Sequence, residues 1–291
     1  MEYSNNMRYI IASKGYEDGT KGGYTDQKRY TELGFEMCVS YLFIKNMINT
    51  GQITSNDVIV TKKDREFLYQ QDHHNVINFD DYLKITPTPE NVRDLVESMM
   101  GAEVETWFKE NFDVKNYAMR EQDYKLIRSF KRSGIIVPPE PFACIAVRKR
   151  VHAGWRNMPD DYTKTLIDRV LKPLSSKVFV IGNDIENLCD SQTVLPASMQ
   201  DFATLSESTN CIACLASASG IIFLPYFFGN AKTIHMLPMP GTYSELMRCI
   251  ERGHPLYHGY NTRFAPSKYF VYDTDRHDHM YDIINNIKAN L

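Results

Sequence analysis

Short apolar, β-branched runs alternate along this chain with longer stretches in which apolar residues recur at helical spacing. In the first half, such runs predict strands at residues 7–13 (MRYIIAS), 57–61 (DVIVT) and 75–79 (NVINF). Between the first two lies ELGFEMCVSYLFIKNMI, which has the length and periodicity of a helix, and Gly51 follows it as a stop signal. An alternation of strand, helix and strand is typical of a parallel α/β layer.

The second half repeats this alternation more clearly. Its pattern predicts strands at residues 143–149, 177–184, 210–215, 233–236 and 269–272, and helices at residues 160–171, 201–208 and 243–250. Asp160 or Asp161 is available as the N-cap of the first of these helices. The pattern also predicts helices at residues 89–100 and 123–133 in the first half, and an amphipathic helix at the C-terminus.

Residues 135–142 (IIVPPEPF) contain three prolines, a density that neither a helix interior nor a central strand tolerates. We interpret this segment as the joint between two α/β domains, residues 1–134 and residues 143–276, with residues 277–291 as a closing helix. A length of 291 residues is enough for two domains with a substantial core.

Composition narrows the class of protein. Hydrophobic residues make up 43% and charged residues 24% of the chain, as in ordinary soluble globular proteins. A formal net charge of -3 provides no basic surface for nucleic acid or an anionic membrane. No stretch resembles a secretory signal or a membrane span, so we expect a cytoplasmic protein with no membrane span. Any phosphate it binds must be held locally, by a few arginines and backbone amides.

The six cysteines are scattered, and several lie inside apolar runs, which favours reduced thiols over a disulfide framework. Cys211 and Cys214 form a CxxC pair, a spacing found in redox and metal sites. In an extended strand, residues three apart face opposite sides, so we expect core thiols here and no metal site. A thiol oxidoreductase using these two residues is the alternative.

Candidate ligand-binding residues follow the predicted strands of the second half. Arg148 ends the strand at residues 143–149, and Arg150 and Arg156 follow it in the turn AVRKRVHAGWRNMP. In open α/β sheets the ligand lies outside the carboxyl ends of the strands, where this turn is expected. Guanidinium groups bind a diphosphate through paired, charge-assisted hydrogen bonds. An exposed basic loop without a ligand is the alternative interpretation.

Two further turns carry residues suited to a ligand. Ser217, Ser219 and Gly220 form the turn ASASG, where small side chains and free amides at a helix start suit an anion, although close packing alone also explains them. Asp184, in the turn GND, is suited to accept hydrogen bonds from a ribose or base, or simply to form the turn.

Taken in order, CIAVRKR, VFVIGND and DFATLSESTNCIACLASASGIIF resemble the C-terminal donor domain of fucosyltransferase-like glycosyltransferases with the GT-B architecture. The resemblance covers residues 143–228. Arg148 matches the arginine that holds the nucleotide diphosphate in that family, and Ser217 with Ser219 matches its serine turn. Ala146 stands where the family has a histidine, a departure that leaves the donor open between GDP-fucose and a UDP-pentose such as UDP-xylose.

The resemblance implies two Rossmann-like domains with a cleft between them, and a last helix that packs back on the first domain. It also implies transfer of a sugar from a nucleotide-diphosphate donor to a glycan hydroxyl, with no metal and no further cofactor. Arg148 would stabilise the departing diphosphate. Asp26, in the glycine-rich loop after the first strand, is the candidate base for the acceptor hydroxyl, although an Asp in such a loop commonly forms a turn.

Two other functions compete with this one. Asp273 and Asp275, in KYFVYDTDRHDH, resemble the Asp-x-Asp metal signature of the other large glycosyltransferase architecture, since alternating carboxylates can share a hard cation. Helix capping and surface charge also explain them. A non-enzymatic protein that binds a nucleotide or sugar would use the same candidate residues.

Overall fold

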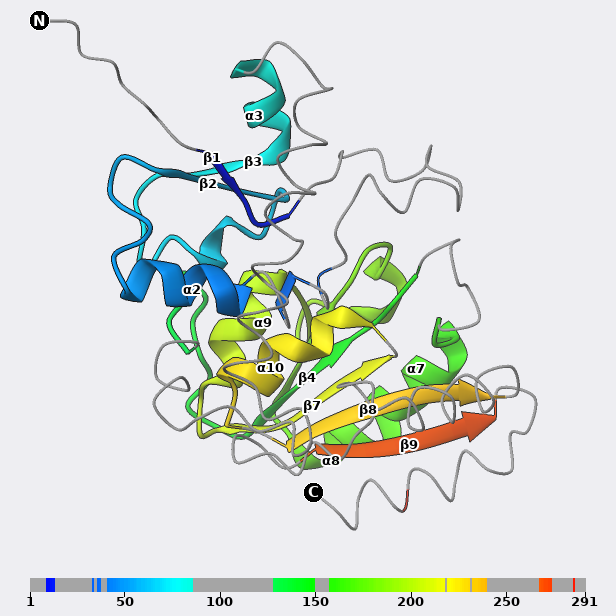
Figure 1. Cartoon of the computed structure of the whole chain (residues 1–291). Coiled ribbons are helices and arrows are strands. Elements are labelled where there is room, and N and C mark those ends of the chain that lie inside the picture. The colour runs from blue at the N-terminus through cyan, green and yellow to red at the C-terminus, as the bar shows by residue number, and fades with distance from the viewer. Residues whose placement is uncertain are drawn as a thin grey trace, which may run out of the picture. The chain divides into compact units, whose positions relative to one another are not determined.

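A computed structural model describes residues 9–13, 33, 36–37, 41–85, 128–149, 157–217, 219–230, 232–239, 267–273 and 285 of the chain. The chain divides into two compact units, Met1–Arg132 and Ser133–Leu291. Each unit contains a parallel sheet with associated helices, so the predicted α/β class is confirmed (Figure 1). The division falls just before the proline-rich segment that we interpreted as the joint, residues 135–142.

The first unit is built on a three-stranded parallel sheet in the order β1-β2-β3. Its elements are β1 (Tyr9–Ile11), α2 (Tyr41–Asn49), β2 (Val58–Thr61), the 3-10 turn η3 (Glu66–Leu68), β3 (Val76–Asn78) and α3 (Phe79–Ile85). All three predicted strands are therefore confirmed. Gly51 follows α2 with a φ of 72°, a left-handed conformation that glycine adopts readily and that ends the helix. Ile11 and Val60 of the sheet pack against Phe79 and Tyr82 of α3.

A buried carboxylate lies near the carboxyl end of β2. Glu36 is fully buried and accepts hydrogen bonds from Thr61 Oγ1 at 2.6 Å and Tyr69 Oη at 3.1 Å. Arg65 Nη1 lies 2.6 Å from Glu36 Oε2 and 3.3 Å from the Ser13 hydroxyl, which follows β1. Burial and the adjacent Glu36 raise the pKa of Tyr69. The network connects the ends of β1 and β2 to η3.

Residues 128–133 correct one prediction, because a helix was expected at residues 123–133 and the described part of that segment is a turn followed by irregular chain. The segment binds other elements of the unit. Lys45, fully buried on α2, pairs with Asp72 and donates to the Ser129 carbonyl at 2.6 Å. Lys131 donates its backbone N–H to the Phe67 carbonyl at 2.8 Å. These contacts favour an irregular path over a helical one.

The second unit contains a six-stranded parallel sheet in the order β6-β5-β4-β7-β8-β9. Its strands are β4 (Phe142–Ala146), β5 (Lys177–Ile181), β6 (Val194–Ala197), β7 (Cys211–Ser217), β8 (Lys232–Met239) and β9 (Ser267–Asp273). Counted from the first strand of the unit, the spatial order is third, second, first, fourth, fifth, sixth. This is the doubly wound order of the Rossmann fold.

Helical elements follow most of these strands. They are α7 (Asp160–Leu166), the π-helical turn η5 (Ile167–Leu171), α8 (Lys172–Leu174), η6 (Glu186–Leu188), α9 (Met199–Ser206), η7 (Gly220–Ile222) and α10 (Phe223–Phe228). The helix predicted at residues 160–171 is thus α7 continued by η5. Among the residues that the structure describes, none of the helices has the length and apolar character needed to span a membrane.

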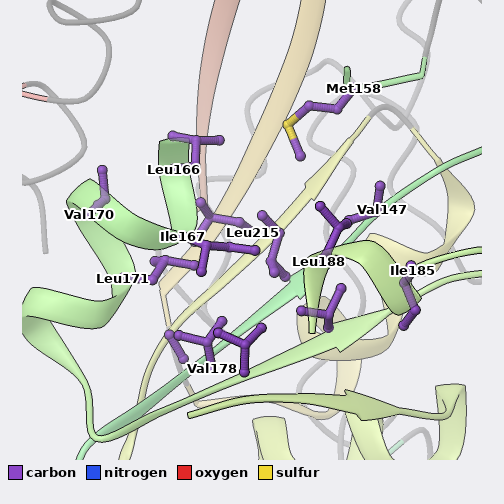
Figure 2. Packing of buried hydrophobic residues seen from close by; sticks show 14 of the residues in the cluster. Val147, Met158, Leu166, Ile167, Val170, Leu171, Val178, Ile185, Leu188 and Leu215 are labelled. Atoms are coloured by element: carbon purple, nitrogen blue, oxygen red, sulfur yellow. The ribbon is translucent and has the colours of Figure 1, made fainter. Parts of the chain in front are cut away.

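The sheet of the second unit has a different set of buried side chains on each face. On one face, Val178 of β5 and Leu215 of β7 pack with Leu166, Ile167 and Val170 from α7 and η5 (Figure 2). Strand residues outside this cluster alternate with those inside it and therefore face the other side. There α9 contacts β4, β5 and β7. Burial on both faces explains why the central strands read as continuous apolar runs.

A β-bulge in β7 corrects the prediction for the CxxC pair. Phe142 of β4 pairs with Cys211, but the next residue, Ala143, pairs with Ala213, so one extra residue, Ile212, enters β7. An extra residue shifts the alternation of side chains by one position. As a result, the sulfur atoms of Cys211 and Cys214 lie on the same side and 3.6 Å apart, where a regular strand would separate them.

The start of α7 differs from the prediction. The expected N-cap of α7 was Asp160 or Asp161, but Pro159 takes that position and Asp160 is the first helical residue.

Strand β6 was not predicted, because Pro196 lies inside it. Proline is tolerated there since β6 is the edge strand of the sheet and needs fewer backbone donors. The helices predicted at residues 89–100 and 243–250 lie outside the described residues, as does the closing helix apart from residue 285.

Candidate functional site

The order of the second sheet defines where a ligand is expected. Strand β4 lies at the point where successive strands change direction across the sheet, with β5 on one side and β7 on the other. In doubly wound sheets, ligands bind outside the carboxyl ends of the strands at this switch point. Here those ends are the residues that follow Ala146 in β4 and the end of β7 at Ser217.

Arg148 and Ser217 meet at the switch point. The backbone N–H of Arg148 donates to Ser217 Oγ at 3.0 Å. Only 6% of Arg148 and 1% of Ser217 are exposed, so the contact is buried. The guanidinium of Arg148 also donates to Asn157 Oδ1 at 2.7 Å, which fixes the direction of the side chain. The structure therefore brings together the two candidate residues that come from neighbouring strand ends.

The turn after β5 is tied to the same edge by Lys149. Its Nζ lies 2.8 Å from Asp160 Oδ1 at the start of α7 and donates to the backbone carbonyl of Asp184 at 2.6 Å. Asp184 has a φ of 53°, which an aspartate tolerates in a tight turn, and it is exposed. The proposed ribose-binding residue thus lies in a turn whose backbone is held against β4.

Gly182 allows the β4 and β5 ends to approach closely. Its φ is 156°, and a Cβ added there would lie 2.5 Å from the Val147 carbonyl oxygen. We expect Gly182→Ala to lower the free energy of unfolding by about 1–3 kcal/mol, because both the backbone conformation and the close approach favour glycine. Urea denaturation measures the change. Gly134→Ala is the control, since a Cβ there has no neighbour within 4 Å, and an equal loss in both variants would contradict the role of Gly182.

The ASASG turn is built as expected at its two ends. Ser217 is the last residue of β7, and Ser219 is the N-cap of η7, with its hydroxyl accepting from the Ile221 N–H at 3.3 Å. Gly220 begins η7, and α10 continues the chain. The Ser219 hydroxyl therefore caps the short helix, while the Ser217 hydroxyl contacts β4.

The contribution of Asp160 to the stability of the fold depends on pH. Burial by itself would raise the pKa of Asp160, but hydrogen bonds from Lys149 and Asn187 outweigh it, so the pKa lies below its ordinary value of 3.8. A carboxylate with a lowered pKa in the folded state stabilises the fold above its unfolded pKa, and that stability is lost as pH falls through the folded pKa. We expect Asp160→Asn to melt below wild type at neutral pH and to converge with it as the pH falls through the lowered pKa of Asp160. Melting curves across this range measure it, and a constant difference at all pH values would contradict it.

The remaining candidate residues either lie outside the described residues or lie away from the ends of β4 and β7. Asp26, Arg150, Arg156 and Asp275 lie outside the described residues. Asp273 ends β9, the last strand of the sheet, with β8 between it and β7. Asp273 pairs with Met239, three residues beyond Met236, the partner of Ser217. At about 4.8 Å per strand and 3.3 Å per residue, its backbone is roughly 14 Å from the end of β7.

Sequence reasoning missed the two residues that position Arg148 and the β5 turn, Asn157 and Lys149. Lys149 stands beside Arg148 in the sequence, and its position directly after a buried strand was the one available signal. Asn157 could be recognised only once the turn had brought it back against β4.

Known proteins similar to this chain are found among solved structures. No family model and no curated protein matches the chain. Among solved structures, it is similar to ADP-heptose LPS heptosyltransferase II of E. coli, with 9% identity, a TM-score of 0.46, and coverage of 97% of this chain and 98% of that one. It is also similar to E. coli heptosyltransferase WaaC in complex with ADP-2-deoxy-2-fluoro heptose, with 9% identity, a TM-score of 0.41, and coverage of 84% and 99%. Likenesses at this level carry no argument about activity, which has to come from the residues of the site.

Proposed function

We propose that this chain is a glycosyltransferase of GT-B type that moves a sugar from a nucleotide-diphosphate donor to a glycan hydroxyl. The observation that carries the proposal is the meeting of Arg148 and Ser217 at the switch point of a doubly wound sheet. This is the position at which such sheets bind nucleotides. The donor would occupy the edge of the second unit, and the acceptor would be bound by the first.

The chemistry of these residues suits a departing diphosphate. Negative charge develops on the diphosphate as the glycosidic bond breaks, and a fixed guanidinium in a buried site stabilises it more than water would. Arg148 is 6% exposed and already oriented by Asn157. Ser217 Oγ accepts from the Arg148 N–H, so its own proton remains available to donate to a phosphate oxygen. These groups supply charge stabilisation without a metal ion.

The finer assignments follow from the resemblance of residues 143–228 to the fucosyltransferase-like donor domain. It favours GDP-fucose or UDP-xylose as the donor, Asp184 as a ribose or base contact, and Arg150 and Arg156 as further diphosphate contacts. Asp26 is the proposed base that deprotonates the acceptor hydroxyl. Because Ala146 stands where that family has a histidine, the nucleotide base stays open, and an ADP-sugar is tested beside the GDP- and UDP-sugars.

A non-enzymatic nucleotide- or sugar-binding protein is the second candidate, since the same switch point would bind its ligand. Release of nucleotide diphosphate from GDP-, UDP- and ADP-sugars, with a mixture of glycans as acceptors and with or without EDTA, separates the two. The transferase predicts release from one donor class, unchanged by EDTA. Binding without release would support the binding protein, and release that EDTA abolishes would support a metal-dependent site at Asp273 and Asp275.

A further inference from the structure

Three cysteine sulfurs gather inside the second unit, away from the candidate site. They belong to Cys144 of β4 and to Cys211 and Cys214 of β7, and all three lie within 4.8 Å of one another. The residues are 0%, 3% and 0% exposed. None of the three residues has a role in the proposed transfer.

The fold creates this cluster through two independent features. Strands β4 and β7 are parallel neighbours, and their register pairs Cys144 with Cys214, which places these two side chains on the same face. The bulge at Ile212 then turns Cys211 to that face as well. A regular β7 would leave Cys211 on the opposite face, so the bulge is what completes the group of three.

The chemistry of the cluster suits a cation. Thiolate sulfur is the form of cysteine that binds a metal ion, and a thiolate in a dry interior is a buried negative charge that is costly without a positive partner. A metal ion would supply that partner and would stabilise the thiolate form of all three residues.

We propose that Cys144, Cys211 and Cys214 form a structural site for a soft divalent cation, with zinc as the candidate ion. Sulfur ligands select soft or borderline ions over magnesium and calcium. Zinc–sulfur bonds of about 2.3 Å in tetrahedral directions require sulfurs about 3.8 Å apart. The observed separations run from 3.6 Å to at most 4.8 Å, so the sulfurs need to move by about 1 Å or less to bind one ion.

Charge decides between a divalent and a monovalent ion. Three thiolates with a divalent ion leave a net charge of −1, whereas copper(I) would leave −2, and a buried site disfavours the larger charge. Within the described part of the chain, the group contains no fourth His, Cys, Asp or Glu. Because the ligands are buried, the ion would enter as the protein folds. The ion would hold β4 against β7, the two strands whose carboxyl ends lead to Arg148 and Ser217.

Metal content tests the proposal in the full chain. Protein from zinc-supplemented cultures is purified with a phosphine reductant, dialysed against EDTA and analysed for metal by mass spectrometry. We expect about one zinc per chain in wild type. The same value is expected in a Cys38→Ala/Cys189→Ala/Cys249→Ala variant, which retains only the three cluster cysteines. Wild-type protein with almost no zinc would overturn the site, whether or not any variant folds.

Single variants assign the ligands. Cys211→Ala and Cys214→Ala are each expected to lose zinc after EDTA dialysis, whereas Cys189→Ala, whose half-buried thiol lies outside the cluster, keeps it. A second readout uses protein produced with cadmium, where thiolate-to-metal charge transfer gives an ultraviolet band that should be present in wild type and absent in Cys211→Ala. Zinc or the band persisting in Cys211→Ala would show that the ion is bound elsewhere and would overturn the assignment.

Discussion

Replacing Arg148 with alanine is expected to weaken binding of the nucleotide diphosphate by about 10- to 100-fold, because one or two charge-assisted hydrogen bonds of roughly 1.5–3 kcal/mol are lost. Arg148 is 6% exposed just beyond the end of β4, and Asn157 accepts a hydrogen bond from its guanidinium. A ligand at this edge would meet a charge that is already oriented. Rearrangement of other residues in the variant would therefore recover little of the lost affinity. Titration calorimetry of wild type and variant with the preferred nucleotide measures the difference.

Two controls separate the role of Arg148 in binding from its role in packing. Arg148→Lys keeps the charge but loses the planar, two-pronged geometry, so we expect an affinity between those of wild type and alanine. Arg169→Ala removes an exposed arginine of η5 and should leave binding unchanged. If Arg148→Ala binds the nucleotide as wild type does while its melting temperature is also unchanged, Arg148 is not part of the site.

Replacing Glu36 with alanine is expected to lower the free energy of unfolding of the first unit by about 3–5 kcal/mol. The carboxylate is fully buried and is shared by Thr61, Arg65 and Tyr69. Its removal takes an acceptor from two hydroxyls and a counter-charge from Arg65, whose side chain is 5% exposed. Urea denaturation followed by circular dichroism measures the loss.

The matched control is an exposed pair of the same unit. Lys84 lies 2.8 Å from Asp81, with side chains that are 75% and 50% exposed, and Lys84→Ala should leave stability nearly unchanged because water screens such pairs. Glu36→Gln keeps an acceptor oxygen without the charge and should fall between wild type and alanine. Equal small losses in Glu36→Ala and Lys84→Ala would show that the buried network does not stabilise the unit.

The elements that sequence predicted best are those whose signal is local. Strands β2, β4 and β7 are short apolar runs buried on both sides, and such runs are recognisable without knowledge of their neighbours. Strand β6 was missed because Pro196 is compatible only with an edge position, which depends on the order of the whole sheet. The irregular path of residues 129–133 likewise depends on contacts with Lys45 and Phe67 far away in the sequence.

The same contrast between local signals and contacts with distant residues applies to the candidate site. Arg148 and Ser217 were predicted because each follows a recognisable strand, and parallel strands bring their carboxyl ends to one edge. The positions of Asn157 and Lys149 depend on how two turns fold back, which no local pattern encodes. Cys211 and Cys214 are core thiols as predicted, but the prediction that they face opposite sides was wrong, since a single inserted residue, Ile212, reverses which side of β7 Cys211 faces.

The most direct test of the central claim is a thermal-shift panel of GDP, UDP and ADP with their sugars, each with and without EDTA. A ligand at 100 times its Kd stabilises the folded state by about 2.7 kcal/mol, which raises the melting temperature by roughly 5–10 °C. We expect a shift of this size with one nucleotide diphosphate, unaffected by EDTA and lost in Arg148→Ala. No shift with any member of the panel, or one that Arg148→Ala retains in full, would contradict a nucleotide site at Arg148.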